Sequence, residues 1–376
     1  MCLSVCLTLS RLRVSRQGRF YALNEGGAPF ELELNWDGGV ERLKGFETKG
    51  GRLDFALSAH PKIDRQTGEM FFHGYSLLSS EAYLRAGRIG ADGKVKAWFQ
   101  VDVPGAGFNH DMSLTSKWAV LFDGSARFTP QQMVEGKPVF SYDSDFTTRI
   151  ALVPRNASGP EDVRWFESPQ PFYVVHPLHA WDEGEEVVIW APLGSEMRPG
   201  KTLDPEQVIY GADDQMRMSE LRIDPVAGTV SVTEIDDTLH SEYCRVRDSL
   251  VGSDKVRYGY AGFMEERDFN FRGMSKWDLR EKRLAATIRY PDNVVGEEPV
   301  FVPHGGDGCD DGFIAVLWIY PEDRRAELVF FDAKTFDPQP VARVLLPRRV
   351  PHGFHGLWLS DEELQTHLSA VGGSLA

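Results

Sequence analysis

Phe313-Ile314-Ala315-Val316-Leu317-Trp318-Ile319-Tyr320 and, after a short polar turn, Ala326-Glu327-Leu328-Val329-Phe330-Phe331 are runs of β-branched and aromatic residues bounded by Gly, Asp or Pro. Such runs are typical of β-strands, and Glu186–Trp190 has the same character. Asp-Gly pairs at 92–93 and 123–124 lie between runs of this kind and indicate hairpin turns. The sequence therefore predicts an all-β protein.

A weak internal repeat narrows the fold class further. In several places a predicted strand ends in an Asp-led turn and another strand follows, as at Asp64, Asp224, Asp278 and Asp332. The last three of these aspartates are spaced 54 residues apart. A four-stranded propeller blade has close to that period, so the spacing favours a β-propeller.

Helix is scarce in the sequence, and the clearest candidate is at the C-terminus. Ser360-Asp361-Glu362-Glu363 forms a capping box that leads into Leu364, His367 and Leu368. No linker or low-complexity tract interrupts the chain, so we expect one domain over residues 1–376, with residues 1–17 as an atypical N-terminal segment.

Composition and charge limit the kinds of partner and compartment that we expect for this protein. The 376 residues carry a net charge of −15, which argues against a nucleic-acid partner. The four cysteines (Cys2, Cys6, Cys244 and Cys309) form no CxxC motif and no disulfide framework, which favours a reduced, intracellular protein. No apolar run is long enough to span a bilayer. We expect a soluble or peripherally membrane-associated protein, of the cytoplasm or of a plastid.

The N-terminal segment can be interpreted in two ways. Met1–Leu9 is apolar but short and lacks a basic leader, so it is a poor signal peptide. Arg11, Arg13, Arg16 and Arg19 resemble an organelle-targeting segment, but a first strand from Leu12 to Leu23 is favoured.

Four histidines stand in distinctive contexts: Ala59-His60-Pro61, Asn109-His110-Asp111, Val175-His176-Pro177 and Phe354-His355-Gly356. Each abuts Gly, Pro or Asp near a predicted strand end, and four imidazoles at one point would bind a divalent transition metal. Their separations of 50, 66 and 179 residues mean that the fold must assemble such a site. The other histidines are expected on the surface or hydrogen-bonded in the core, although spacing alone leaves His179 and His352 open as ligands; they are His73, His179, His240, His304, His352 and His367.

The same contexts resemble the motifs of the carotenoid cleavage oxygenase family, in order. Ala59–Asp64 with Thr67–Tyr75 resembles the first iron-ligand segment, His110–Thr115 the second, His176 with Ala180–Glu183 the third, and Arg349–Gly356 the last. The matching region runs from about residue 18 to 360. The resemblance implies a seven-bladed β-propeller, incomplete at the N-terminus, with a non-haem Fe(II) on its axis.

By that resemblance the iron ligands are His60, His110, His176 and His355, and three glutamates lie behind them. Glu25 would orient His110, Glu242 would orient His176, and Glu298 would orient His355. A carboxylate that accepts the far ring N–H of a histidine fixes its tautomer and raises its basicity as a ligand.

The implied activity is addition of both atoms of dioxygen across a C=C bond of a carotenoid or apocarotenoid, giving two carbonyl products. One Fe(II) per chain is required, with no organic cofactor and no catalytic side chain beyond the ligands. An apolar polyene would need a tunnel, for which Phe108, Trp118, Phe122, Phe140, Trp181 and Trp358 are candidates, with plain core packing as the alternative for each. Peripheral contact with a membrane surface is also expected.

The chain departs from the family pattern at several positions. His179 stands where the third motif usually has asparagine, and Val175 where it has phenylalanine. Met1–Gln17 is short compared with the segment that relatives carry there, which leaves open a catalytically impaired apocarotenoid-binding propeller. Asn24 replaces the lysine of stilbene-cleaving relatives and favours carotenoids. A stilbene-cleaving or a retinoid-isomerising relative is the remaining alternative.

Overall fold

The computed structural model describes residues 2–3, 11–14, 18–25, 27–37, 39–50, 52–53, 55–76, 83–129, 131, 140–195, 216–265, 270–350, 353 and 355–371. The chain divides into two compact units. The first unit holds residues 1–102, 156–162 and 351–376, and the second holds 103–155 and 163–350. The expected single domain stays a prediction.

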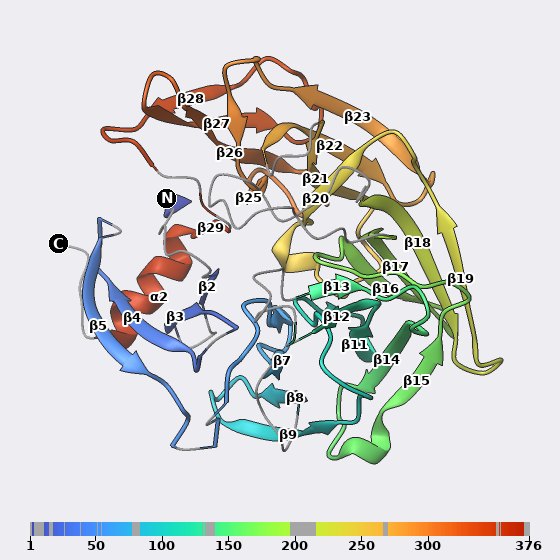
Figure 1. The fold of residues 1–376 in the computed structure, drawn as a ribbon. Coiled ribbons are helices and arrows are strands. Elements are labelled where there is room, and N and C mark those ends of the chain that lie inside the picture. Colours follow the sequence, from blue (N-terminus) through green and yellow to red (C-terminus); the bar gives the residue numbers. More distant parts are fainter. Residues whose placement is uncertain are drawn as a thin grey trace. The chain divides into compact units, whose positions relative to one another are not determined.

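The first unit contains two four-stranded antiparallel sheets whose strands follow chain order (Figure 1). One comprises β2 (Arg11–Val14), β3 (Phe20–Leu23), β4 (Phe30–Leu34) and β5 (Val40–Phe46). The other comprises β6 (Lys62–Ile63), β7 (Met70–Tyr75), β8 (Leu84–Ile89) and β9 (Val95–Val101). β1 (Cys2–Leu3) pairs with β29 (Leu357–Trp358), and a 3₁₀ turn, η1, covers Pro160–Asp162.

The expected single strand from Leu12 to Leu23 is wrong. β2 and β3 are separate antiparallel strands, with Arg11 opposite Leu23 and Val14 opposite Phe20. Gly18 lies between them with φ of 70°. A Cβ added there would lie 2.7 Å from the backbone of His367, so this position accepts only glycine without rearrangement.

The short C-terminal helix is confirmed as α2 (Asp361–Val371), and its predicted capping box is formed. The Ser360 N–H donates to Glu363 Oε2 at 3.0 Å, and the Glu363 N–H donates to Ser360 Oγ at 3.2 Å. The helix packs against β4 (Figure 1). His367 is fully buried there: its Nε2 accepts the Leu34 N–H at 2.9 Å and its Nδ1–H donates to the Gly18 carbonyl.

The second unit repeats the four-stranded pattern. One set comprises β10 (Ser113–Leu114), β11 (Trp118–Asp123), β14 (Arg149–Pro154) and β15 (Arg164–Glu167). The next comprises β16 (His179–Glu183), β17 (Glu186–Leu193), β18 (Arg217–Asp224) and β19 (Thr229–Glu234), and it is followed by β20 (His240–Arg245), β21 (Tyr258–Met264), β22 (Phe271–Asp278) and β23 (Arg283–Arg289). The last comprises β25 (Val300–Pro303), β26 (Gly312–Tyr320), β27 (Arg325–Asp332) and β28 (Ala342–Leu345).

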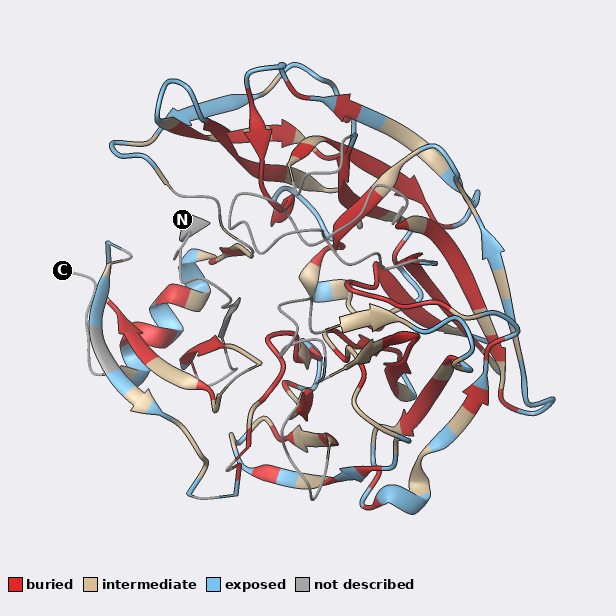
Figure 2. Ribbon diagram, in the orientation of Figure 1, coloured by how far each residue is buried: buried red, intermediate tan, exposed pale blue. Residues whose placement is uncertain are grey.

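Four smaller elements are also found among the described residues of the second unit. β24 (Val295–Gly296) pairs with both β22 and β26 and joins the last two sets into one nine-stranded sheet. β12 (Ala126–Phe128) and β13 (Phe140–Tyr142) form a separate ribbon, and η2 covers Asp248–Leu250. Figure 2 shows the middle strands β17 and β22 mostly buried, while the outer strands β19 and β28 are largely exposed and β23 is partly exposed.

The 54-residue repeat of aspartates is a true repeat of structure. Asp224, Asp278 and Asp332 each end the third strand of a set, and the side-chain Oδ1 of each accepts two backbone N–H groups of the turn to the fourth strand. This is the Asx turn expected of a short carboxylate at a strand end. Asp64 forms a similar turn, but between the first and second strands of its sheet, so it is not part of the same repeat.

Of the two Asp-Gly pairs, one prediction is confirmed and one is wrong. Asp92-Gly93 connects β8 to β9, and Gly93 has φ of 72°. Asp123-Gly124 makes no hairpin, because β11 pairs with β14 while β12 pairs with β13. Asp123 is held instead by Arg127 and Arg149, each through a contact of 2.6 Å.

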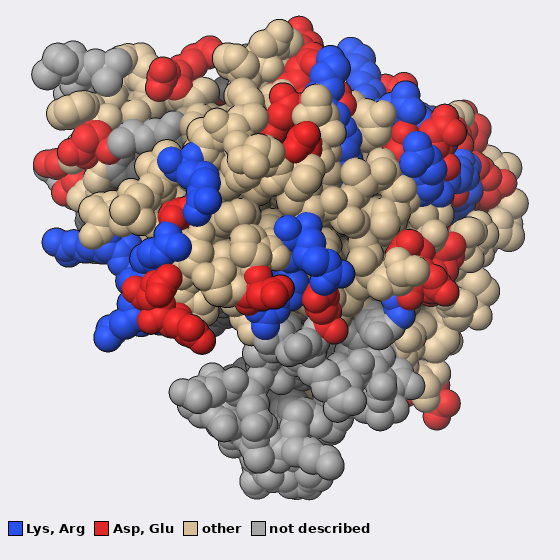
Figure 3. Space-filling view, turned by 90° about the horizontal axis from the view of Figure 1, so that it is seen from above, with Lys and Arg blue, Asp and Glu red and all other residues tan. Residues whose placement is uncertain are grey.

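Charged side chains of both signs lie beside one another on the face drawn in Figure 3. Ion pairs between side chains of the second unit include Arg222 with Glu186 at 2.5 Å. Of the cysteines, Cys244 is buried and Cys309 is partly buried. Within the part of the chain that the structure describes, no helix combines the length and the apolar run that a membrane crossing needs.

Candidate metal centre

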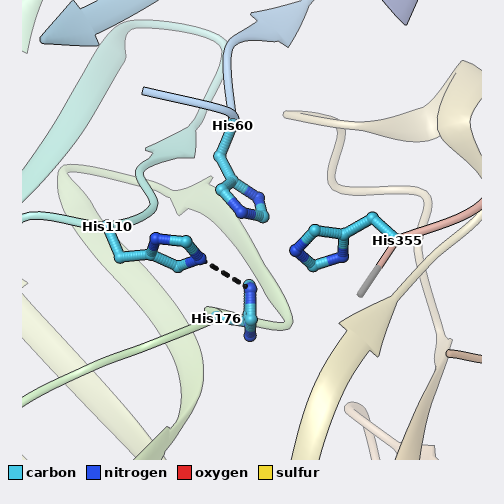
Figure 4. Close-up of side chains that lie close together, drawn as sticks. All are labelled: His60, His110, His176 and His355. Carbon is cyan, nitrogen blue, oxygen red and sulfur yellow. Dashed lines mark hydrogen bonds between the residues drawn. The ribbon is translucent and has the colours of Figure 1, made fainter. Parts of the chain in front are cut away.

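The first unit brings His60 and His355 together. His60 is fully buried in the loop before β6, and His355 is half-buried just before β29. Their ring centroids lie 4.6 Å apart with an interplanar angle of 84°, an edge-to-face arrangement (Figure 4). The segments that carry them are tied by an ion pair: Arg65, in the turn after β6, donates to Glu363 of the α2 capping box at 2.7 Å.

The second unit brings His110 and His176 together in the same manner. Their centroids lie 4.9 Å apart at 76°, and their Nε2 atoms face each other at 3.1 Å, marked by the dashed line in Figure 4. The side chain of Asn109 donates to the Phe122 carbonyl at 2.5 Å and fixes the residue before His110. Thr115 Oγ1 donates to Asp182 Oδ1 at 3.1 Å, which ties the His110 segment to the strand after His176.

Glu242 of β20 lies behind His176. Its Oε2 contacts His176 Nδ1 and also accepts the Tyr243 N–H at 3.0 Å. A carboxylate oxygen in this position accepts the Nδ1–H and leaves the lone pair on Nε2. Burial raises the pKa of Glu242 to about 7, although the Tyr243 N–H and the nearby histidines oppose that rise. The contact that the family resemblance implies between Glu242 and His176 is therefore present.

The donor set of the second unit fits a divalent transition metal. Two imidazole nitrogens that each lie about 2.1 Å from one ion, at right angles to each other, are about 3.0 Å apart. The observed separation of the two Nε2 atoms is 3.1 Å. His60 and His355 have nearly the same mutual ring geometry in the first unit. Each of the four histidines offers one ring nitrogen as a ligand.

The two other predicted glutamates have contacts of their own. Glu25 Oε1 accepts the N–H of Ala59, the residue before His60, at 3.3 Å. Glu298 is buried and receives two hydrogen bonds from Arg245, Nε to Oε1 and Nη2 to Oε2, both 2.8 Å. The orienting roles of Glu25 on His110 and of Glu298 on His355 stay predictions.

The side chain of His179, the alternative ligand, interacts with other residues. Its Nε2–H donates to the Ser253 carbonyl at 2.8 Å, and its ring stacks on Trp181 with centroids 5.9 Å apart. His367 is the buried core residue described above, and His304 is exposed beside Phe313. His352, the other alternative, lies outside the described residues.

The candidate tunnel residues separate into two groups. Phe108 lies at the histidines: its ring stacks on His110 with centroids 5.4 Å apart and meets Phe140 edge-on at 5.1 Å. Trp118 and Phe122 belong to the core of the β11 and β17 sheets instead, and Trp181 belongs to the core shared by β17 and β22. These three fit the plain core alternative. Trp358 is half-buried in β29, opposite Cys2.

Two residues near the histidines were missed by the sequence reasoning. Tyr243 meets His176 edge-on, with centroids 5.2 Å apart, from a backbone with φ of 53°. Arg245 forms the buried ion pair with Glu298. A spacing of three residues from Glu242 was the available signal for Arg245, but in a regular strand it would place the two side chains on opposite faces.

Comparison with known proteins identifies the family. The family model described as retinal pigment epithelial membrane protein matches residues 11–360. Carotenoid 9,10(9′,10′)-cleavage dioxygenase of Crocus sativus is 29% identical over 374 residues, which cover 94% of this chain and 66% of that protein. The chromoplastic zeaxanthin 7,8(7′,8′)-cleavage dioxygenase of Crocus sativus is 31% identical over 366 residues, which cover 92% of this chain and 94% of that protein. The chain thus spans about two thirds of the first relative's length and nearly all of the second's.

Solved structures give the fold. Pseudomonas brassicacearum lignostilbene dioxygenase superposes with a TM-score of 0.78 at 22% identity, covering 93% of this chain and 75% of that one. Cobalt-substituted Synechocystis apocarotenoid oxygenase also gives 0.78, at 24% identity, covering 93% and 74%. The predicted all-β propeller fold of the carotenoid oxygenases is confirmed by these neighbours, and the class of dioxygenase is the class of the named relatives. The chain belongs to the family of the retinal pigment epithelial membrane protein and the carotenoid cleavage dioxygenases.

Proposed function

We propose that the chain is an iron(II)-dependent dioxygenase that cleaves one C=C bond of a carotenoid or apocarotenoid into two carbonyl products. The observation that carries the proposal is the pairing of the four predicted ligands, His60 with His355 and His110 with His176. In this proposal the two pairs hold one ion between them, with Glu25, Glu242 and Glu298 behind them.

The metal follows from the donors and the family. A set of neutral imidazoles suits iron, copper, zinc or nickel, and the Synechocystis apocarotenoid oxygenase has been solved in a cobalt-substituted form. Iron is chosen because the activity proposed requires activation of dioxygen. When bound, iron would supply the capacity to activate dioxygen, and His60, His110, His176 and His355 are the residues that would hold it. The atoms balance without a reductant: both oxygen atoms enter the products, one in each carbonyl group.

The chain's own residues retain the metal and orient the substrate. Glu242 keeps the proton of His176 on Nδ1, so that Nε2 presents its lone pair. Phe108 stacks on His110 and offers an apolar surface beside the ligand, where a conjugated chain would lie. Carotenoids and zeaxanthin are named as substrates of the curated relatives, and Asn24 favours this class over stilbenes. Contact with a membrane surface stays a prediction.

The test is product analysis with labelled dioxygen. Protein reconstituted with Fe(II) is incubated with a panel of carotenoids, apocarotenoids, stilbenes and retinyl esters under ¹⁸O₂, and the products are identified by mass spectrometry. We expect two carbonyl products from a carotenoid or apocarotenoid, each with one labelled oxygen, and none from His355→Ala. The exposed His304→Ala variant serves as the matched control and should retain the activity.

Other outcomes would contradict the proposal, each in favour of a named alternative. Tight binding of an apocarotenoid that is recovered unchanged would indicate a non-catalytic binding protein. Cleavage confined to stilbenes would indicate a stilbene dioxygenase. Isomerised retinoid without label would indicate an isomerase.

A further inference from the structure

A β-bulge in β20 sets the direction of two side chains. Glu242 pairs with Gly262 of β21, and Arg245 pairs with Tyr260. Residues 243 and 244 of β20 therefore oppose the single residue 261 of β21, so β20 contains one extra residue between Glu242 and Arg245. Since Gly262 and Tyr260 lie on one face of the sheet, the bulge returns Glu242 and Arg245 to that face as well.

The bulge is held at a cost in backbone energy. Tyr243 adopts φ of 53°, in the left-handed region that an aromatic residue rarely occupies. The same residue packs edge-on against His176. Strain at a residue that touches a predicted ligand, in the segment that aims Glu242, indicates that the direction of these side chains matters to the protein.

The two buried glutamates of this region differ in their electrostatic partners. Glu298 accepts hydrogen bonds from Nε and Nη2 of the buried Arg245 guanidinium, both at 2.8 Å. Among the described residues, Glu242 Oε2 contacts His176 Nδ1 and accepts the Tyr243 N–H, while its buried Oε1 has no hydrogen-bond partner there. Burial disfavours the charge of Arg245, yet Glu298, Asp248 and Asp111 together raise the pKa of Arg245 above its usual value. Asp111 directly follows His110.

The positive charge of Arg245 bears on the buried acids around it. Arg245 carries a positive charge that is paired with the buried Glu298, and Asp248 and Asp111 also act on it. Buried charges are tolerated only when they are balanced and hydrogen-bonded, and Arg245 meets both conditions for Glu298. A bidentate guanidinium also fixes the plane of the Glu298 carboxylate, which a lysine would not do.

We propose that Arg245 is a positioning residue of the metal centre, which fixes the Glu298 carboxylate and balances the charge of the buried acids. This inference rests on the proposed metal site. Arg245 touches neither the metal nor the substrate in this proposal; it acts through Glu298. Metal retention therefore depends on it, whereas binding of the polyene does not.

The test measures metal affinity and steady-state kinetics in Arg245→Met, Arg245→Lys, Glu298→Gln and the double variant Arg245→Met/Glu298→Gln. Co²⁺, followed by its visible absorption, is the metal probe. Arg257→Met is the matched control, because Arg257 also donates from Nε and Nη2 to a buried carboxylate, Asp278, in the same sheet. The thermal midpoint of each metal-free variant is recorded alongside.

For Arg245→Met we expect the Kd for Co²⁺ to rise about tenfold, the size that loss of an outer partner typically has. The kcat should fall while KM for the carotenoid stays as in the wild type. Arg245→Lys keeps the charge but not the bidentate geometry, so its Kd for Co²⁺ should lie between those of the wild type and Arg245→Met. Arg245→Lys also tests the inference if Arg245→Met does not fold. The double variant should match Glu298→Gln, because Arg245 acts through Glu298.

Two results would overturn the inference, and they are distinguishable. If the wild type binds Co²⁺ but Arg245→Met differs from Arg257→Met only in its thermal midpoint, Arg245 is a structural residue and the inference fails alone. If the wild type binds no Co²⁺ or Fe²⁺, the proposed function fails and the inference fails with it.

Discussion

The carboxylate of Glu242 lies against Nδ1 of His176, so that a buried acid fixes which nitrogen of the imidazole carries the proton. The other side of the ring, Nε2, faces His110 at 3.1 Å. A single side chain thus determines whether the lone pair of His176 is available for a metal, and the first prediction follows from this contact.

Replacing Glu242 by alanine should weaken the binding of Co²⁺ or Fe²⁺ by about 10- to 100-fold, because Nδ1 loses its acceptor. Glu242→Gln should lose less, because an amide oxygen still accepts the Nδ1 proton but no longer carries charge. Equilibrium titration with Co²⁺ measures both. Equal affinity in the wild type and in Glu242→Ala would refute the role of Glu242.

His110 and His179 make a matched pair of substitutions. His110→Ala should abolish stoichiometric metal binding and product formation, because its Nε2 faces that of His176. His179→Ala should keep the metal, because His179 Nε2–H is engaged by the Ser253 carbonyl at 2.8 Å. Metal content by mass spectrometry of the purified variants decides between the two histidines. Loss of metal in His179→Ala with retention in His110→Ala would contradict the assignment.

His240 should make stability depend on pH. Burial lowers the pKa of His240 to about 4, against the charge of Glu242, which raises it. The unfolded chain takes up a proton near pH 6.5 while the folded protein does not until about pH 4, so the free energy of unfolding falls as the pH drops through this range. For a shift of this size the loss is at most about 3 kcal/mol.

The measurement is urea unfolding of the metal-free protein at pH 7.5, 6, 5 and 4.5. His240→Gln should show a smaller decrease over this range than the wild type, since the glutamine takes up no proton. Parallel pH profiles for the two proteins would show that His240 contributes nothing to acid sensitivity.

The aspartate repeat predicts a stability effect that spares chemistry. Asp332 Oδ1 accepts the Lys334 N–H at 2.9 Å and the Thr335 N–H at 2.7 Å. Asp332→Ala should lower the free energy of unfolding by about 1–3 kcal/mol, the range for hydrogen bonds to a charged group. The exposed Asp237→Ala is the control and should change it by less than about 0.5 kcal/mol. A lower metal content per folded Asp332→Ala molecule would show that the turn does more than stabilise the sheet.

Local pattern was enough to predict several of the secondary-structure elements. The apolar runs at 313–320 and 326–331 form β26 and β27, and the capping box begins α2. These succeed because strand composition and helix caps are short-range properties of the chain. Strand boundaries near the N-terminus and the turn at 123–124 were wrong, because backbone conformation at Gly18 and sheet membership of β11 depend on neighbours far away in sequence.

The sequence by itself determined that this is a β protein with a repeated Asp-led turn and four histidines in ligand-like contexts. Only the tertiary structure decided that His60 meets His355, that His110 meets His176, and that His179 turns to Ser253 instead. It also decided that Arg245 shares a face with Glu242, through a bulge that the spacing of three residues conceals. The physical reason is that the composition of a strand and the hydrogen bonds of a turn depend on residues that are close in sequence. The direction of a side chain depends instead on strand register, and register is fixed by pairing with strands that are distant in sequence.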